Sequence, residues 1–276
     1  GMMHGFNANT GVEVFAYTPN AVMNNLVDLT NINYNHKYFV DESPVIVDAF
    51  FGTPAAWHSV LVSGLRAGGQ GIFALDVTNP DDFSSEATAK NKVLWEFTDS
   101  DDNDLGFTYG TPSVVLLRDG TWAAIFSGGY NNTFDDDGDS TTANDSTDGN
   151  AYLYIVDISD GSLIKKFDTK TGSAEDPTGN GRPNGLSPPS IVDIDDDFTA
   201  DYIYSGDLFG NVWKFDISTN ASSSWGFAYG TNTNPEPLYT ACSAATCNAS
   251  NTQAITTQLQ VVRHPTKGGF IVLFGT

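Results

Sequence analysis

One pattern of strands recurs along the chain and restricts its fold more than any other feature. Each copy begins with a strand introduced by Pro and continues with an aliphatic strand that ends in Gly. A third strand, a polar turn and a returning strand complete the copy. The Pro-led strands begin at Ser43, Thr111 and Ser187. Four short antiparallel strands per repeat are typical of β-propeller blades. The sequence therefore predicts an all-β fold, a modified β-propeller of four-stranded antiparallel blades, with residues 1–276 as a single domain.

The segments outside these repeats are expected to differ from them. Residues 20–29 follow Pro19 and carry apolar side chains at a spacing that suits a short helix. Polar composition predicts loops at residues 81–90, 131–150, 170–186 and 219–256. The chain starts and ends within strand-like sequence, so we expect several blades of a longer protein, with the propeller incomplete and the targeting signals elsewhere.

An acidic run separates the first two strands of the copy that begins at Ser187. It reads Asp-Ile-Asp-Asp-Asp-Phe-Thr-Ala-Asp over residues 193–201. Alternate residues of an extended or turning backbone point the same way, so Asp193, Asp195 and Asp197 can converge. The Asp201 carboxylate and a carbonyl near Thr199 would help to complete the coordination shell of calcium, which prefers about six to eight oxygens. The spacing predicts a Ca²⁺ site with these five residues as ligands.

This run differs from an EF-hand loop, which has about twelve residues, a central Gly, a terminal Glu and flanking helices. Here Phe198 takes the place of that Gly, the run closes at Asp201, and both flanks are strand-like. The alternative is a solvated acidic turn without a metal, because Asp is common in turns. A similar alternation at Asp135, Asp137 and Asp139 raises a second cation site, but we favour a polar insertion there because no strand adjoins it.

Charge and cysteine content restrict the partners and the compartment. The chain has 34 acidic and 12 basic residues, a net charge of −22. This charge argues against nucleic acid and anionic membrane surfaces as partners. No apolar run approaches the ~20 residues of a membrane helix, so no membrane insertion is expected. Cys242 and Cys247 could close a local disulfide in an oxidising compartment, which we favour over free thiols.

Taken together, these segments resemble the PilY1/PilC family of tip-associated adhesins and assembly factors of type IV pili. The resemblance rests most strongly on the acidic run and the strands that follow it, residues 193–216. The other matching segments are residues 1–6, 56–58, 68–77, 95–99, 128–131, 184–187, 263–265 and 274–276. The family usually has Gly where Asp196 and Phe198 stand in this chain.

The resemblance implies a modified β-propeller at the C-terminal end of a longer protein. It also implies that calcium in the acidic loop, bound by Asp193, Asp195, Asp197, Thr199 and Asp201, regulates pilus extension, retraction and surface attachment. The implied partners are minor pilins at the pilus tip, and host or abiotic surfaces. The implied location is the cell surface, reached by export through the periplasm.

Two other functions are compatible with the same repeats. Quinone-dependent (PQQ) dehydrogenases are propellers with similar repeats and a calcium ion, but no segment here supplies a recognisable cofactor pocket and carboxylate base. We therefore predict that the chain is not an enzyme. The other alternative is an extracellular scaffold in which calcium is purely structural. Calcium affinity would distinguish that scaffold from a regulatory site. The dissociation constant of a regulatory site should lie near the sensor range of about 10⁻⁷ to 10⁻⁵ M, or be weaker outside the cell.

Overall fold

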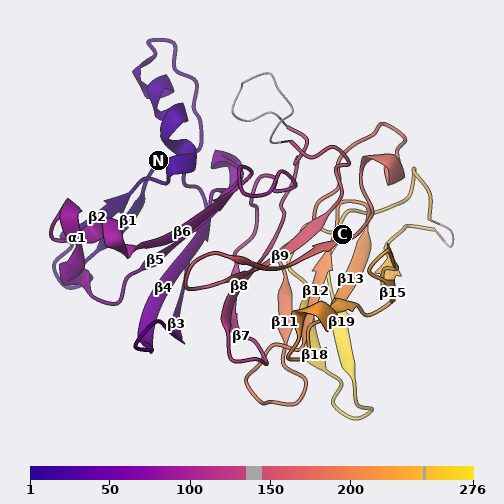
Figure 1. Ribbon diagram of the computed structural model, residues 1–276. Helices are drawn as coiled ribbons and strands as arrows, with labels where there is room; N and C mark the ends of the chain where they lie inside the picture. Colours follow the sequence, from indigo (N-terminus) through magenta and orange to yellow (C-terminus); the bar gives the residue numbers. More distant parts are fainter. Residues whose placement is uncertain (135–144, 245–246) are drawn as a thin grey trace.

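Three antiparallel sheets follow one another along the chain and form the body of the molecule (Figure 1). The computed structural model describes residues 1–134, 145–244 and 247–276. The first sheet has the order β3-β4-β5-β6 and the second the order β10-β9-β8-β7. Their strands are β3 (Val45–Phe51), β4 (Ala56–Gly64), β5 (Gly71–Asp76), β6 (Val93–Thr98), β7 (Ser113–Leu116), β8 (Trp122–Ser127), β9 (Tyr152–Asp157) and β10 (Leu163–Asp168).

The third sheet has the order β11-β12-β13-β14, and one further short strand, β17, also pairs with β13. Three two-stranded hairpins, β1-β2, β15-β16 and β18-β19, complete the strands of the described residues. The bounds are β11 (Ser190–Val192), β12 (Tyr202–Gly206), β13 (Asn211–Asp216), β14 (Gly226–Phe227), β17 (Tyr239–Thr240), β1 (Met3–Phe6), β2 (Glu13–Tyr17), β15 (Gly230–Thr231), β16 (Asn234–Pro235), β18 (Gln260–Arg263) and β19 (Phe270–Leu273). The all-β prediction and the four-stranded unit are confirmed.

Helices are short and lie in the connections. The longest follows Pro19, as predicted, but it is a 3-10 helix rather than an α-helix. The helices are η1 (Asn20–Thr30), η2 (Arg66–Gly68), η3 (Pro80–Phe83), α1 (Glu86–Ala89), η4 (Lys90–Lys92), η5 (Ser173–Glu175) and η6 (Ser222–Ser224). None of the helices in the described part of the chain is long and apolar enough to cross a membrane.

Three of the predicted loops were wrong in part: residues 170–186 contain the short helix η5, and the other two are 81–90 and 219–256. Residues 81–90 contain helical turns, which begin where the Asn79 side chain accepts a hydrogen bond from the Asp81 amide and Pro80 occupies the first turn. Such caps favour a helix start even without apolar periodicity. The segment 219–256 contains β14 to β17, strands of two residues each. A strand this short has no alternation that a sequence pattern could show.

The core consists of layers between successive sheets, because the central strands bury both faces. On β8, Ala124 and Phe126 pack toward the first sheet, whereas Ala123 and Ile125 pack toward the third. The strand β9 divides its side chains in the same way. Each large apolar side chain buried here contributes about 1.5–3 kcal/mol. The layers hold the sheets in fixed relative positions, and with them the loops at the sheet ends.

Further layers lie outside the three sheets. The β1-β2 hairpin and η1 cover the outer face of the first sheet, where Met3 and Val22 pack with Phe73. The β18-β19 hairpin lies on the other side of the third sheet, where Val261 and Phe270 pack against a cluster that includes Val212. The third sheet therefore lies between the second sheet and β18-β19, and its connecting loops can contact both.

Candidate metal centre

The acidic loop, residues 193–201, connects β11 to β12. Its ends are held in antiparallel register, with Ser190 opposite Tyr204 and Val192 opposite Tyr202. A backbone hydrogen bond from the Asp201 amide to the Val192 carbonyl, 3.0 Å long, closes the base of the loop. The prediction that the loop joins the first two strands of its sheet is confirmed.

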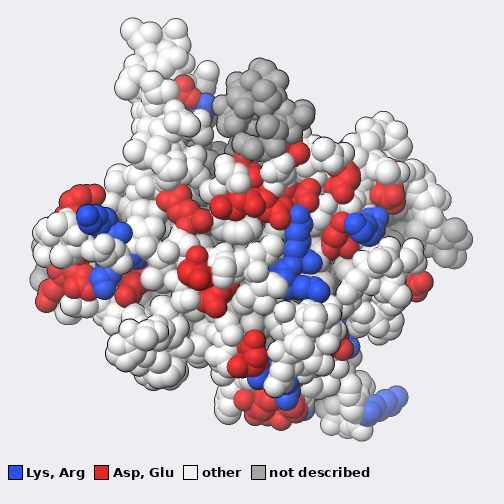
Figure 2. Space-filling view, viewed as in Figure 1, with Lys and Arg blue, Asp and Glu red and all other residues white. Residues whose placement is uncertain are grey.

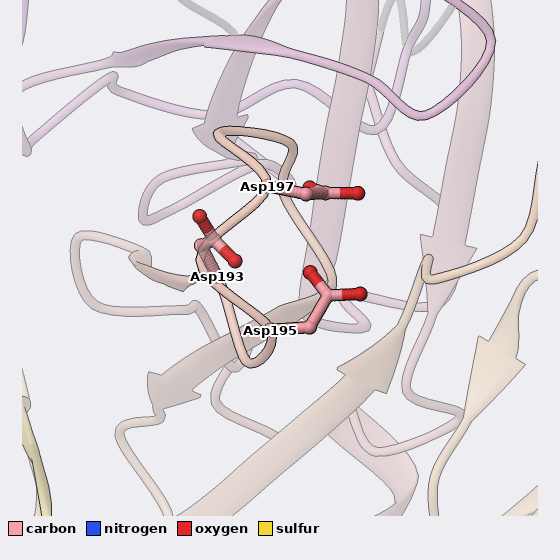
Figure 3. Close-up of side chains that lie close together, drawn as sticks. All are labelled: Asp193, Asp195 and Asp197. Carbon is pink, nitrogen blue, oxygen red and sulfur yellow. The ribbon is translucent and has the colours of Figure 1, made fainter.

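Three of the predicted ligands lie together on this loop. One carboxylate oxygen from each of Asp193, Asp195 and Asp197 lies within 4.8 Å of the others. Figure 3 shows Asp195 and Asp197 reaching to the same side of the loop, with Asp193 between them. The alternating spacing thus produces the expected convergence.

Asp193 organises the loop backbone. Its Oδ1 accepts a hydrogen bond from the Asp196 amide at 2.7 Å, and its Oδ2 accepts one from the Phe198 amide at 2.8 Å. Both donors belong to residues with positive φ, 61° at Asp196 and 70° at Phe198. Gly adopts this left-handed region without strain. The geometry explains why Gly suits these two positions.

The fifth predicted ligand, Asp201, lies at the buried end of the loop. Its side chain has no exposed surface, and its Oδ2 accepts a hydrogen bond of 2.8 Å from the Ile194 amide. Thr199 lies beside Asp197, and its amide and hydroxyl both donate to Asp197 Oδ1, at 2.9 and 2.6 Å. These two bonds hold the pKa of Asp197 below its usual value. The role of the Thr199 carbonyl stays a prediction.

A basic residue that sequence reasoning missed lies at the centre of the site. Arg118 belongs to the turn between β7 and β8, in the neighbouring sheet. Its Nη2 lies 3.0 Å from Asp195 Oδ2, 3.2 Å from Asp197 Oδ2 and 3.1 Å from Asp201 Oδ1. The hydrogen bonds to Asp195 and Asp201, with the negative charge of Asp197, raise the pKa of Arg118. Lys and Arg are rare in this chain, with only 12 in total, and this rarity was the one sequence signal that could have drawn attention to Arg118.

A second arginine holds the loop from its other side. Arg263, at the end of β18, donates through Nη2 to the Ile194 carbonyl at 2.7 Å and to Asp196 Oδ1 at 2.9 Å. Both side chains of this ion pair are more than half exposed. An exposed pair of this kind contributes little to stability. Its effect is positional, because it links the loop to β18-β19.

The donor set fits a hard cation. Asp195, Asp197 and Asp201 direct one oxygen each at a single positively charged nitrogen, so the structure marks a point where a cation is stabilised. Calcium binds such oxygens at about 2.3–2.6 Å, and carboxylate oxygens are its usual ligands. Magnesium requires a tighter octahedron and keeps its waters, which suits this loop less well.

The remaining sequence predictions about sites have different outcomes. The Cys242–Cys247 disulfide is present, with a sequence separation of 5 residues. Asp135, Asp137 and Asp139 lie outside the described residues. Figure 2 shows acidic side chains spread over the viewed face, with fewer basic ones, in keeping with the net charge of −22.

Comparisons with known proteins agree on the family. The family model described as the PilY1 beta-propeller domain matches residues 1–276. The type IV pilus biogenesis factor PilY1 of Pseudomonas aeruginosa (strain UCBPP-PA14) is 40% identical over 294 aligned positions, which cover 100% of this chain and 22% of that protein. A PilY1 homolog of Xylella fastidiosa is 39% identical over 280 positions, covering 100% of this chain and 17% of that protein.

A solved structure supports the same conclusion. The crystal structure of the Pseudomonas aeruginosa PilY1 C-terminal domain matches with a TM-score of 0.74 and 37% identity, over 100% of this chain and 50% of that chain. The chain spans about a fifth of the length of the curated relatives. The resemblance inferred from the sequence is confirmed, and the chain belongs to the PilY1 β-propeller family.

Proposed function

We propose that this chain is the calcium-binding β-propeller of a type IV pilus biogenesis factor and adhesin. In this proposal calcium binds the acidic loop through Asp193, Asp195, Asp197, Asp201 and the carbonyl of Thr199. Occupancy of the loop regulates pilus extension, retraction and surface attachment. The partners are minor pilins at the pilus tip, and host or abiotic surfaces, and the site of action is outside the cell. We propose no catalytic role.

One observation carries the proposal. Three carboxylate oxygens from the loop converge on one cationic nitrogen, although mutual repulsion would otherwise separate them. One of the three belongs to a side chain with no exposed surface. A buried carboxylate is stable as an ion only when charge or hydrogen bonds compensate it. The loop therefore has the oxygen ligands and the unbalanced negative charge that a divalent cation requires.

Calorimetric titration tests the binding step. Calcium, and magnesium in a parallel arm, are titrated into the wild-type chain and into Asp195→Asn and Asp197→Asn. Asp160→Asn, on an exposed turn of the second sheet, is the control for the change of net charge. We expect calcium to bind wild type and control with equal affinity, within about 10⁻⁷ to 10⁻³ M. Each loop variant should bind calcium at least tenfold more weakly than the wild-type chain. Equal binding by the loop variants would refute the assignment.

A cellular assay tests the regulatory step. The Asp195→Asn exchange is introduced into the full-length protein in the bacterium that encodes it. We expect altered surface piliation and twitching in medium containing calcium, with a normal level of the protein. Asp160→Asn serves again as the control. Wild-type pilus behaviour in a strain whose loop no longer binds calcium would contradict a regulatory role.

The alternative to a regulatory role is a purely structural role for the same ion. One observation favours it. The loop contacts both flanking sheets, through the hydrogen bond from the Ala200 amide to the Leu116 carbonyl on one side and through Arg263 on the other. Calcium would then stabilise the packing of the sheets. Chelation should in that case lower the melting temperature of the domain while leaving pilus dynamics unchanged in the Asp195→Asn strain.

A further inference from the structure

Arg118 lies at the point where the proposed cation would bind. We propose that Arg118 is a built-in counter-ion, which holds the acidic loop together without calcium and which calcium must displace. The inference rests on the proposed function, since it concerns the same site. It adds a residue from a different sheet that competes with the metal and sets its apparent affinity.

The geometry makes the two cations mutually exclusive. A single nitrogen, Arg118 Nη2, lies 3.0 to 3.2 Å from oxygens of Asp195, Asp197 and Asp201. A calcium ion that binds the same oxygens at about 2.3–2.6 Å occupies the space of that nitrogen. Two positive charges at one point would also repel each other strongly. Calcium can therefore coordinate this set only after the guanidinium has moved.

The rest of the Arg118 side chain offers little resistance to displacement. Its Nε is buried and has no hydrogen-bond partner among the described residues. The side chain as a whole is 29% exposed, so water is within its reach. The described contacts that hold the guanidinium are thus those of Nη2 with the three loop carboxylates, and calcium would replace all of them. A displaced guanidinium would regain hydration, which favours the exchange.

The exchange leaves the loop attached to the neighbouring sheet. The Ala200 amide donates a hydrogen bond of 2.9 Å to the Leu116 carbonyl at the end of β7. This backbone contact is independent of the Arg118 side chain. Calcium would therefore remove the ion pairs between the two sheets without separating the backbones. The metal-free and metal-bound states then differ mainly in the position of one side chain.

The charge balance predicts which cation is favoured. The loop carries five carboxylates, Asp193, Asp195, Asp196, Asp197 and Asp201. Arg118 supplies one positive charge to three of them, and calcium supplies two. Calcium is therefore favoured once its concentration is sufficient. The affinity measured for the wild-type chain is lower than the intrinsic affinity of the carboxylates, because part of the binding energy displaces Arg118.

Calcium titration of Arg118→Gln tests the proposal. Arg182→Gln is the matched control, because it removes one positive charge from an ion pair with Asp176, outside the loop. We expect Arg118→Gln to bind calcium about tenfold more tightly than wild type, within the usual range of coupling between two ligands. Arg182→Gln should change the dissociation constant less than about twofold. Arg118→Lys keeps a competing charge and should bind more weakly than Arg118→Gln.

Thermal unfolding supplies a second measurement. In chelator, the melting temperature of Arg118→Gln should lie below that of wild type, because the loop carboxylates have lost their counter-ion. Saturating calcium should remove most of that difference. An unchanged circular dichroism spectrum of Arg118→Gln would show that this variant still folds.

The outcomes separate this inference from the proposed function. Calcium binding that is equal in Arg118→Gln and Arg182→Gln, or weaker in Arg118→Gln, would overturn the role of Arg118 and leave the calcium site standing. Absence of calcium binding in every variant, including Arg118→Gln, would refute both. Tight binding confined to Arg118→Gln would support competition in its strongest form.

Discussion

A buried carboxylate in the turn between β12 and β13 should not tolerate even an isosteric substitution. Asp207 has no exposed surface. Its Oδ1 accepts hydrogen bonds from the amides of Phe209, at 2.9 Å, and Asn211, at 2.8 Å. Its Oδ2 accepts three more, from the side chains of Asn184, Asn211 and Trp213, at 3.0, 2.9 and 2.8 Å. Burial raises the pKa of Asp207, and these donors offset part of that rise.

The magnitude for Asp207→Asn follows from that arrangement. In Asn the amide nitrogen replaces one carboxylate oxygen, and this nitrogen cannot accept hydrogen bonds. If it takes the Oδ1 position, two donors lose their acceptor, and if it takes the Oδ2 position, three do. Rotating the amide by half a turn does not help. Each buried donor left without an acceptor costs about 1–3 kcal/mol. We therefore expect Asp207→Asn to lower the free energy of unfolding by about 2–6 kcal/mol, a large share of the roughly 5–15 kcal/mol of a typical domain.

Urea denaturation of the 276-residue chain, followed by circular dichroism, measures this loss. Near-ultraviolet spectra should change as well, because the Trp213 indole is one of the donors. Asp216→Asn is the control: Asp216 Oδ1 accepts from the Ser218 amide and hydroxyl, and the Asn carbonyl can accept both bonds. The control should stay within about 0.5 kcal/mol of wild type. A loss below about 1 kcal/mol for Asp207→Asn would refute the reasoning.

Three further predictions concern the loops. Phe198 has φ of 70° and is 88% exposed, so its side chain adds little packing. Phe198→Gly should therefore raise the unfolding free energy by about 0.5–1 kcal/mol, whereas Phe198→Ala, which keeps the strain, should not. Burial opposes ionisation of Asp176, but hydrogen bonds from Arg182 and Thr178 hold its pKa well below the usual value. The stability that this carboxylate contributes is present above about pH 4 and is lost as the pH falls, so Asp176→Asn should show a shallower loss of stability toward pH 2, and an unchanged slope would contradict this. Replacing both Cys242 and Cys247, which are 5 residues apart, with Ser should cost about 2 kcal/mol or less in denaturant titrations, because the closed ring is short; a larger loss would mean that the disulfide positions more than its own loop.

The strands of the three sheets could be predicted because their patterns are local. On β8 and β9 almost every residue is apolar, which suits strands that bury both faces, and Gly128 directly follows β8. The acidic loop was predictable for the same reason, since Asp193, Asp195 and Asp197 are neighbours in the chain and the backbone alone brings them together.

Arg118 could not be predicted in this way. It lies 77 residues before Asp195 and 83 before Asp201, and only the packing of the second sheet on the third brings it to the loop. The helical turns at 81–90 and the two-residue strands β14 to β17 escaped prediction for a different reason. They depend on a cap or on single pairs of residues rather than on a repeated pattern.

The attachment of the acidic loop to both flanking sheets has a mechanical consequence. A tensile force that pulls β18-β19 away from the third sheet loads the exposed contacts of Arg263 with Ile194 and Asp196, together with the apolar packing beneath the hairpin. These contacts are weaker than the strand pairing within either sheet. A load too small to unfold the domain can therefore change the shape of the loop and the spacing of its carboxylate oxygens. If calcium binds the loop as proposed, tension across these sheets would be coupled to its release.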